Sequence, residues 1–155
     1  MAGGVALNCV ANGRIYNETN RDPKMLQRIN EIKSREGFRP IAPIVKCNAF
    51  DRFFVGKKDP YMLFCCNALP ETTKSIPSVV HVDGTSRVQV VSRKSNYFIY
   101  TLVDEFEKIS GIPVIINTSF NLRGKPIIEQ PLDAVMALFT SNLDFLVLED
   151  YLVEK

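Results

Sequence analysis

Three segments of the chain repeat hydrophobic residues every three to four positions, which is the spacing of a helix with one buried face. The first begins at Asp22 and Pro23, two residues that suit a helix start, and we expect it to end at Gly37. The second covers about 96–110 and the third about 131–141. In the second helix we expect one buried face, formed by Phe98, Leu102, Phe106 and Ile109.

Short apolar or alternating runs between these helices predict strands. Residues 41–47, 61–66 and 113–116 are mainly apolar, and residues 145–153 have strand character at the end of the chain. Polar and apolar residues alternate over 86–91, as in a half-buried strand. This mixture indicates an α/β or α+β fold, with a mixed sheet flanked by helices rather than a purely parallel sheet.

Composition narrows the class of protein. At 155 residues the chain has room for one domain, and 46% hydrophobic and 23% charged residues are ordinary for a globular protein. It has neither a long apolar run nor a basic leader followed by an apolar stretch, so we expect no transmembrane helix, no signal peptide and a cytoplasmic location. A net charge of +2 is small for a nucleic-acid-binding protein, so nucleic acid is not an expected partner.

The stretch 117–124 (NTSFNLRG) directly follows the apolar strand 113–116. The ends of strands are where open α/β sheets bind ligands, and a glycine there lets the backbone approach a phosphate. We therefore take Ser119, Asn121 and Arg123 as candidate binding residues. A polar turn that only hydrogen-bonds its own backbone has the same composition, and the residues alone leave both interpretations open.

Further cations lie outside this stretch. Residues 33–40 (KSREGFRP) hold three cations around a helix C-terminus, where positive charge complements the helix dipole. Arg39 lies beyond that helix in a stiff segment, which suits bidentate binding of a carboxylate or phosphate. Arg87 follows an Asp-Gly turn. With Lys33 and Arg123 these residues suit a polyanion, and phosphoryl or adenylyl transfer needs such cations.

A metal site is not expected. His81 is the only histidine, and with Asp83 it offers two ligands from one segment, so we interpret it as a structural residue beside a turn. The cysteines have neither zinc-site nor redox-pair spacing, and we expect reduced thiols at Cys9, Cys47, Cys65 and Cys66.

Six segments carry a resemblance to a known family: KSREGFRPIAP, PYML, IPSVVHVDGTSRVQVV, GIPVIINTSFNLRGKPI, PLDAV and FLVLEDYLVEK. In this order, residues 25–155 resemble the C-terminal domain of the O-carbamoyltransferases that modify aminoglycosides, cephalosporins and nodulation factors. The resemblance implies a YrdC-like twisted mixed β-sheet flanked by helices. It also implies that the domain uses ATP with Mg²⁺ and carbamoyl phosphate to form carbamoyl-adenylate, which a separate domain uses to carbamoylate a hydroxyl.

The resemblance also assigns roles to the candidate residues. It implies that Lys33, Arg39 and Arg87 are the catalytic cations that bind the phosphates. Ser119, Asn121 and Arg123 would form the rest of the nucleotide and carbamoyl phosphate pocket.

Residues 1–15 resemble a motif of the family's N-terminal transferase domain and continue through a connector, 16–24, into the C-terminal domain. The stretch that holds that domain's metal ligands is missing, so we expect no iron. Complete transfer is then not expected from this chain alone, and a separate transferase domain or a homo-oligomer is an expected partner. Two other functions stay open: a non-catalytic remnant that oligomerises or binds a protein, and an RNA-binding YrdC-like domain.

Overall fold

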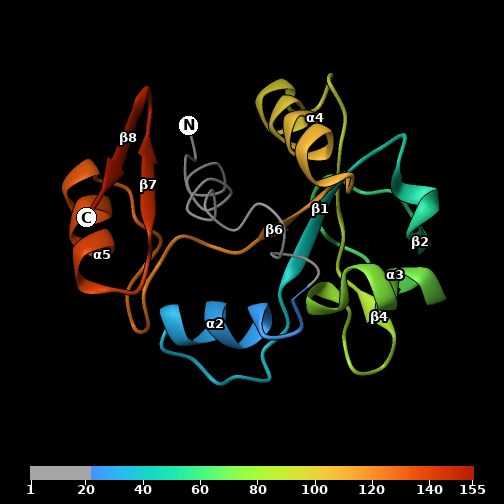
Figure 1. Cartoon of the computed structure of the whole chain (residues 1–155), viewed down its shortest axis with the longest axis horizontal. Coiled ribbons are helices and arrows are strands. Elements are labelled where there is room, and N and C mark those ends of the chain that lie inside the picture. Colours follow the sequence, from blue (N-terminus) through green and yellow to red (C-terminus); the bar gives the residue numbers. More distant parts are fainter. Residues whose placement is uncertain (1–21) are drawn as a thin grey trace.

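A computed structural model describes residues 22–155, in which a central three-stranded sheet has helices on both faces (Figure 1). Strand β1 (Ala42–Lys46) lies in the middle. It pairs in parallel with β5 (Gln89–Val91) and antiparallel with β6 (Val114–Asn117). The predicted α/β class and the mixed sheet are therefore confirmed.

The two faces of this sheet belong to different hydrophobic cores. Side chains that alternate along each strand point to opposite faces. One face packs on α4 (Tyr97–Ser110) through Ile99 and Val103. The other face packs on α2 (Met25–Ile32) through Ile29. The strands are thus buried on both sides, which explains why they are nearly all apolar.

Helix α2 starts at Met25, later than the predicted start at Pro23, and it also ends early. The carboxylate of Asp22 accepts the backbone N–H of Lys24 at 2.8 Å in the turn that precedes the helix, and the N-cap residue Lys24 forms no side-chain cap. The helix ends at Ile32 rather than near Gly37, because Ser34 adopts a left-handed φ of 50° and turns the chain.

Helix α4 has the predicted bounds but a different buried face. Asn96 accepts the N–H of Ile99 at its start, and Gly111 ends it with a φ of 74°. Of the predicted face, Leu102 and Phe106 are half-buried against the core, but Phe98 and Ile109 are each 57% exposed, so the prediction was only partly right. The fully buried residues are Ile99 and Val103. The helix has apolar residues on more than one side, and the β-branched stripe is the one that meets the sheet.

A second, antiparallel sheet has the order β2-β3-β4, with strands Phe54–Val55, Cys66–Ala68 and Thr85–Ser86. The short helix η1 (Phe50–Arg52) precedes β2, and α3 (Pro70–Ser75) and η2 (Pro77–Val79) lie between β3 and β4.

Two strand predictions in this region were wrong. The predicted strand 61–66 is mostly a loop, because the carboxylate of Asp59 accepts the backbone N–H groups of Tyr61 and Leu63 at 2.8 and 3.2 Å and forms a turn. The predicted strand 86–91 is interrupted at 87–88, so its two halves join different sheets.

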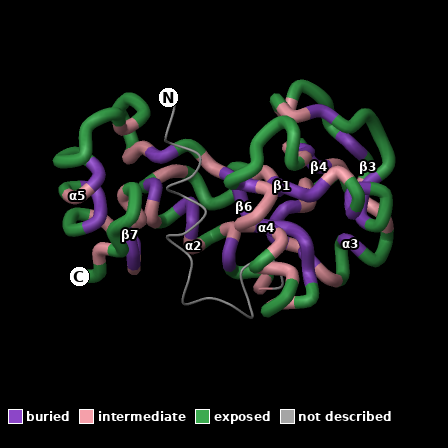
Figure 2. Tube along the Cα trace, turned by 90° about the horizontal axis from the view of Figure 1, so that it is seen from above, coloured by how far each residue is buried: buried purple, intermediate pink, exposed green. Residues whose placement is uncertain are grey.

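The C-terminal residues form a separate unit with its own core (Figure 2). Helix α5 (Pro131–Thr140) packs on a hairpin of β7 (Phe145–Leu148) and β8 (Tyr151–Glu154), where one strand had been predicted. The chain reverses at Glu149, which has a left-handed φ of 53°. The buried members of this core are Phe120, Ala134, Ala137, Leu138, Leu143 and Leu146.

The predictions for residues 1–15, for Cys9 and for most of the connector lie outside the described residues. Within 22–155, none of the helices combines the length and the apolar character needed to cross a membrane.

A buried ammonium group anchors α4 to the central sheet. Lys46, at the end of β1, is only 4% exposed and forms ion pairs with Asp104 (2.7 Å) and Glu107 of α4. Burial alone lowers the pKa of Lys46, but its hydrogen bonds to these two carboxylates outweigh that effect and raise the pKa. The same contact lowers the pKa of Asp104.

We predict that Lys46→Met lowers the free energy of unfolding by about 1–3 kcal/mol, because it leaves two carboxylates without their cation. A carboxyl with a lowered pKa stabilises the fold above its unfolded pKa and loses that effect as pH falls. The difference from the wild type should therefore be largest near neutral pH and shrink below about pH 4 in urea titrations. Lys94→Met, an exposed site, is the control; an equal loss there would contradict the prediction.

Candidate functional site

One end of the central sheet gathers three of the segments singled out from the sequence. Strand β6 ends at Asn117, opposite Ala42, the first residue of β1. Because β1 and β5 are parallel, β5 begins at this same end. The segment before β1 carries Arg39, the segment before β5 carries Arg87, and the segment after β6 carries Ser119.

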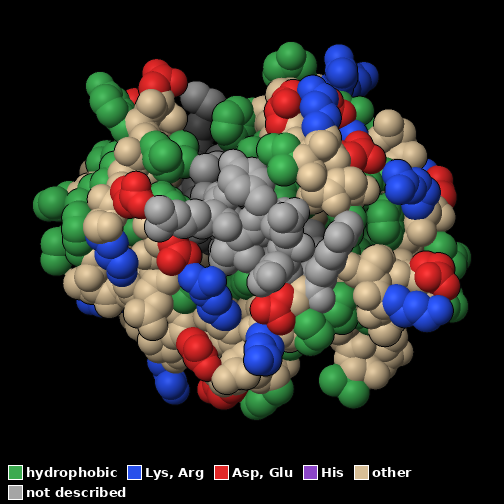
Figure 3. Space-filling view, viewed as in Figure 1, with side chains coloured by type: hydrophobic (Ala, Val, Ile, Leu, Met, Phe, Trp, Pro, Cys, Tyr) green, Lys and Arg blue, Asp and Glu red, His purple; other side chains and the backbone are tan. Residues whose placement is uncertain are grey.

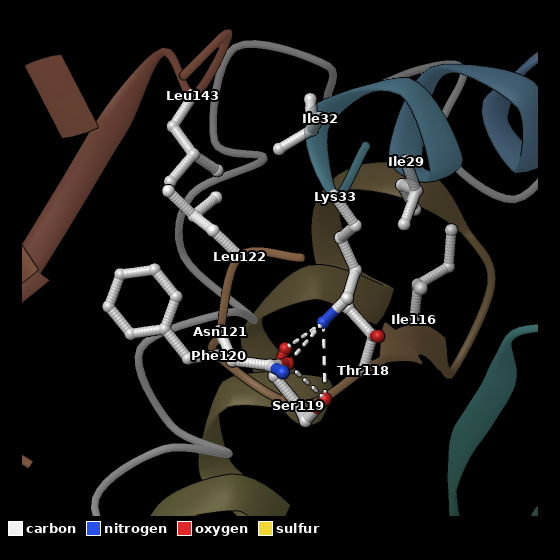
Figure 4. Close-up of a pocket in the computed structure, with 10 residues that line it drawn as sticks. All are labelled: Ile29, Ile32, Lys33, Ile116, Thr118, Ser119, Phe120, Asn121, Leu122 and Leu143. Atoms are coloured by element: carbon white, nitrogen blue, oxygen red, sulfur yellow. Dashed lines mark hydrogen bonds between the residues drawn. The ribbon is translucent and has the colours of Figure 1, made fainter. Parts of the chain in front are cut away.

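Lys33 joins helix α2 to the loop that follows β6 (Figure 4). Its side chain is almost completely buried, and its ammonium group donates to the backbone carbonyl of Ser119, to the Ser119 hydroxyl (3.1 Å) and to Asn121 Oδ1 (2.8 Å). The Ser119 hydroxyl also donates to Asn121 Oδ1 at 2.7 Å. Three of the predicted site residues are therefore in direct contact, and all three ammonium hydrogens of Lys33 have acceptors.

The environment of Lys33 makes its charge costly. Burial, and then the positive charge of Arg35, lower the pKa of Lys33 to about 8. The three acceptors around the ammonium are all neutral oxygens. A bound anion would therefore be a stronger partner for this cation than the groups that now surround it.

The three predicted arginines lie at the rim. Arg39 is exposed and pairs with Glu36 at 2.8 Å, and Arg123 donates to the carbonyl of Ser34 at 3.3 Å, so both lie beside the end of α2. Arg87 is exposed and, within residues 22–155, forms no hydrogen bond or ion pair with the other predicted residues. The structure thus places Arg87 at the same end of the sheet without joining it to the cluster.

The structure adds Arg35, which sequence reasoning did not select. Its Nε donates to the side chain of Asn30 at 2.5 Å, and Asn30 is fully buried and also donates to the carbonyls of Gly37 and Arg39. The Nη2 atom of Arg35 is enclosed, yet it has no hydrogen-bond partner among the described residues. Because an enclosed donor without an acceptor is costly, this atom indicates an anion-binding position. The signal in the sequence was the third cation of the stretch 33–39.

A small cavity lies between α2, the loop after β6 and the C-terminal unit (Figure 4). Its volume is about 30 Å³, which holds water but not a nucleotide. The lining residues are Ile29, Ile32, Lys33, Ile116, Thr118, Ser119, Phe120, Asn121, Leu122 and Leu143.

A sequence profile of the carbamoyltransferase C-terminus matches residues 15–155. The chain belongs to this family. Nodulation protein U of Rhizobium tropici is 46% identical to it over 114 residues, which cover 73% of this chain and 20% of that protein.

More distant relatives cover more of this carbamoyltransferase C-terminal domain. Nodulation protein NolNO of Sinorhizobium fredii is 39% identical over 142 residues, covering 88% of the chain and 20% of the relative. An uncharacterised protein of Methanocaldococcus jannaschii is 37% identical over 137 residues, covering 87% and 22%. The chain therefore spans about a fifth of the length of the relatives it matches.

The other residues considered as metal ligands in this carbamoyltransferase domain, His81 and Asp83, form hydrogen-bond contacts within one turn. Asp83 accepts the N–H and the hydroxyl of Thr85 at 2.9 and 2.7 Å, and His81 Nδ1 lies 3.1 Å from the same hydroxyl. These contacts form the turn that was expected. Within residues 22–155 there is no group of three or more His, Cys, Asp or Glu that could hold a metal ion. The described cysteines, Cys47, Cys65 and Cys66, are free thiols.

We predict that Lys33 makes the free energy of unfolding of this domain change with pH in the alkaline range. Because its folded pKa is lowered from 10.5 to about 8, the unfolded state binds more protons between these values, and stability rises with pH across that interval. In urea unfolding, the wild type should gain about 2–3 kcal/mol relative to Lys33→Met between pH 8 and 10.5. A constant difference between the two proteins from pH 7 to 10.5 would show that the ammonium is not buried as described.

Proposed function

We propose that this chain binds carbamoyl phosphate and ATP and forms carbamoyl-adenylate, from which a separate domain transfers the carbamoyl group to a hydroxyl. The observation that carries the proposal is the contact of Lys33 with Ser119 and Asn121, next to the enclosed Nη2 of Arg35 that lacks an acceptor. Buried cations beside hydroxyl and amide groups at a sheet end suit phosphate oxygens. Membership of the carbamoyltransferase family supports the choice of carbamoyl phosphate.

The proposed reaction has two steps. Water cleaves carbamoyl phosphate into carbamate and phosphate. A carbamate oxygen then attacks the α-phosphorus of ATP, and a new P–O bond forms while the bond to the oxygen bridging the α- and β-phosphates breaks and pyrophosphate leaves. Both reactants of the second step are anions, so the step needs cations that hold them together and stabilise the charge on the transferred phosphoryl group.

The degree of burial suggests how the cations divide this work. Lys33 and the Nη2 atom of Arg35 are enclosed, so their charges act at a lower dielectric than in water, where stabilisation of the α-phosphate would be strongest. Arg39, Arg87 and Arg123 are exposed and suit the outer phosphates together with the Mg²⁺ that ATP brings. We assign hydrogen bonding of phosphate oxygens to Ser119 and Asn121.

Binding requires the loop after β6 to move. The cavity of about 30 Å³ is far smaller than a nucleotide, and Lys33 has no free hydrogen. A phosphate oxygen would have to replace at least one of the three neutral acceptors. The ammonium would then face a negatively charged oxygen instead of a neutral one, and the added Coulombic attraction favours this exchange.

The alternatives have less support. On the face in Figure 3, Lys and Arg side chains are interspersed with Asp and Glu, whereas RNA-binding surfaces are predominantly basic. A non-catalytic remnant offers no reason for a buried ammonium beside an enclosed guanidinium nitrogen at one sheet end, since burial of positive charge without an anion is costly. We also propose that the chain acts in the cytoplasm, and that the acceptor hydroxyl is bound by another domain or polypeptide.

We predict that Arg39→Ala weakens ATP binding about tenfold or more, because each charge-assisted contact contributes roughly 1.5–3 kcal/mol. Isothermal titration with ATP and Mg²⁺, and then with carbamoyl phosphate, measures this. Arg93→Ala, which changes an exposed arginine in the turn between β5 and α4, should leave the affinity unchanged. If both variants lower the affinity for ATP equally, Arg39 attracts ATP only through its general positive charge, which would contradict a specific contact with the phosphates.

We also predict that the chain exchanges labelled pyrophosphate into ATP only when carbamoyl phosphate is present, because exchange requires the adenylate to form reversibly. Lys33→Met and Arg35→Met should each abolish the exchange. ATP binding without exchange at any carbamoyl phosphate concentration would favour the non-catalytic remnant.

A further inference from the structure

Helix α5 has an exposed apolar face, opposite the face that packs on the β7–β8 hairpin. Leu132, Met136 and Phe139 recur at helical spacing on this face, and each is more than half exposed. Hydrophobic side chains gather at the left edge of Figure 3, where α5 lies in Figure 1. We call these three residues the outer stripe.

The opposite side of α5 is apolar as well. Ala134, Ala137 and Leu138 are buried in the C-terminal core, and Asp133 is the one charged residue among residues 131–140. A helix that is apolar on both sides is normally buried on both sides. The fold of residues 22–155 covers only the inner side, so the outer stripe lacks the cover that its composition calls for.

The two ends of α5 carry opposite charges. Asp133 lies in the first turn, at the positive end of the helix dipole. The ammonium of Lys155 lies at the other end, where it donates to the carbonyls of Leu138 and Ser141. A second α5 that ran antiparallel to the first would therefore bring unlike charges together at both ends, whereas a parallel one would bring like charges together.

The spacing of the outer stripe suits the same antiparallel arrangement. Its midpoint falls beside Met136, so a twofold axis there places Met136 against the same residue of a second copy. The same rotation places Leu132 against Phe139 of the second copy, so that a smaller side chain meets a larger one at both ends. The outer stripe is thus complementary to itself in both shape and charge.

We propose that the outer stripe is a dimer interface, in which α5 packs antiparallel against α5 of a second copy of this chain. Met136 lies at the centre of this interface, and Asp133 of each copy lies toward Lys155 of the other. The proposal concerns association of the chain and does not depend on the carbamoyl chemistry.

The size of the outer stripe limits the strength of this dimer. Specific interfaces bury about 800 Å² per partner, and the three exposed side chains offer roughly half of this area. Interfaces at this low end of the range are weak and reversible. We therefore expect a dissociation constant on the order of 10–100 μM.

Two other occupants fit the outer stripe less well. Helices that lie on membranes carry Lys and Arg on their polar face, but residues 131–140 contain neither, and Asp133 would be repelled by anionic lipids. A domain of unrelated sequence could cover an apolar stripe, but it would require neither a twofold midpoint at Met136 nor opposite charges at the two helix ends. These two features favour a second copy.

The first test is the mass of the protein by sedimentation velocity from about 1 to 500 μM. We expect the mass to rise from that of one chain toward that of two. Met136→Glu should raise the dissociation constant at least about tenfold, because it places two carboxylates against each other at the centre of the interface. Ile109→Glu, an exposed apolar site of similar exposure on α4, is the matched control and should leave the dissociation constant unchanged.

The second test is disulfide formation at single introduced cysteines, in a Cys65→Ser background that removes an exposed thiol. Met136→Cys should form a disulfide between two copies, which peptide mass spectrometry locates. Leu132→Cys should not, because the antiparallel packing separates the two copies of this position by about 10 Å along the helices.

A wild type that stays a single chain at 500 μM would overturn the proposal. So would a rise in mass that Met136→Glu leaves unchanged, because the copies would then meet elsewhere. A disulfide at position 132 but not at 136 would exclude the antiparallel geometry. Binding of ATP and carbamoyl phosphate is measured separately, so failure of this proposal would leave the proposed function intact.

Discussion

The contact between the ammonium of Lys33 and the loop after β6 is the interaction on which the other parts of the site depend. It lies at the C-terminal end of helix α2, holds Ser119 and Asn121, and lies where Phe120 of the same loop enters the C-terminal core. One buried cation therefore joins the central sheet, α2 and the C-terminal unit. Any ligand that competes for Lys33 must also change how these three parts are held together.

Hydrophobic spacing was enough to predict the main elements around this contact, because α2, α4, α5, β1 and β6 are long or strongly apolar. The errors occur where a single side chain or dihedral overrides the local pattern. Asp59 folds an apolar run into a loop, and Glu149 breaks an apolar strand into a hairpin. The buried face of α4 depends on which of its apolar stripes meets the sheet, which is a property of packing and not of the helix itself.

The sequence was enough to predict which types of residue form the candidate site, but not which of these residues contact one another. Ser119 and Asn121 follow an apolar strand, which is a local signal, but their bonds to Lys33 depend on where α2 crosses the sheet. Arg35 was missed because a cation after a helix already has an explanation in the helix dipole. The bond between Asn117 and Gln89 joins residues 28 apart and depends on strand register, which no single-sequence pattern contains.

The polar cluster around Lys33 has one property that explains how a closed structure can still be a binding site. Lys33 bonds to neutral oxygens only, so its ammonium has acceptors weaker than the phosphate oxygens of the proposed ligand. The internal contacts avoid the cost of unpaired buried groups in the absence of ligand. A phosphate oxygen would form the stronger bond, so an acceptor that holds the loop after β6 closed can be exchanged without leaving the ammonium of Lys33 unpaired.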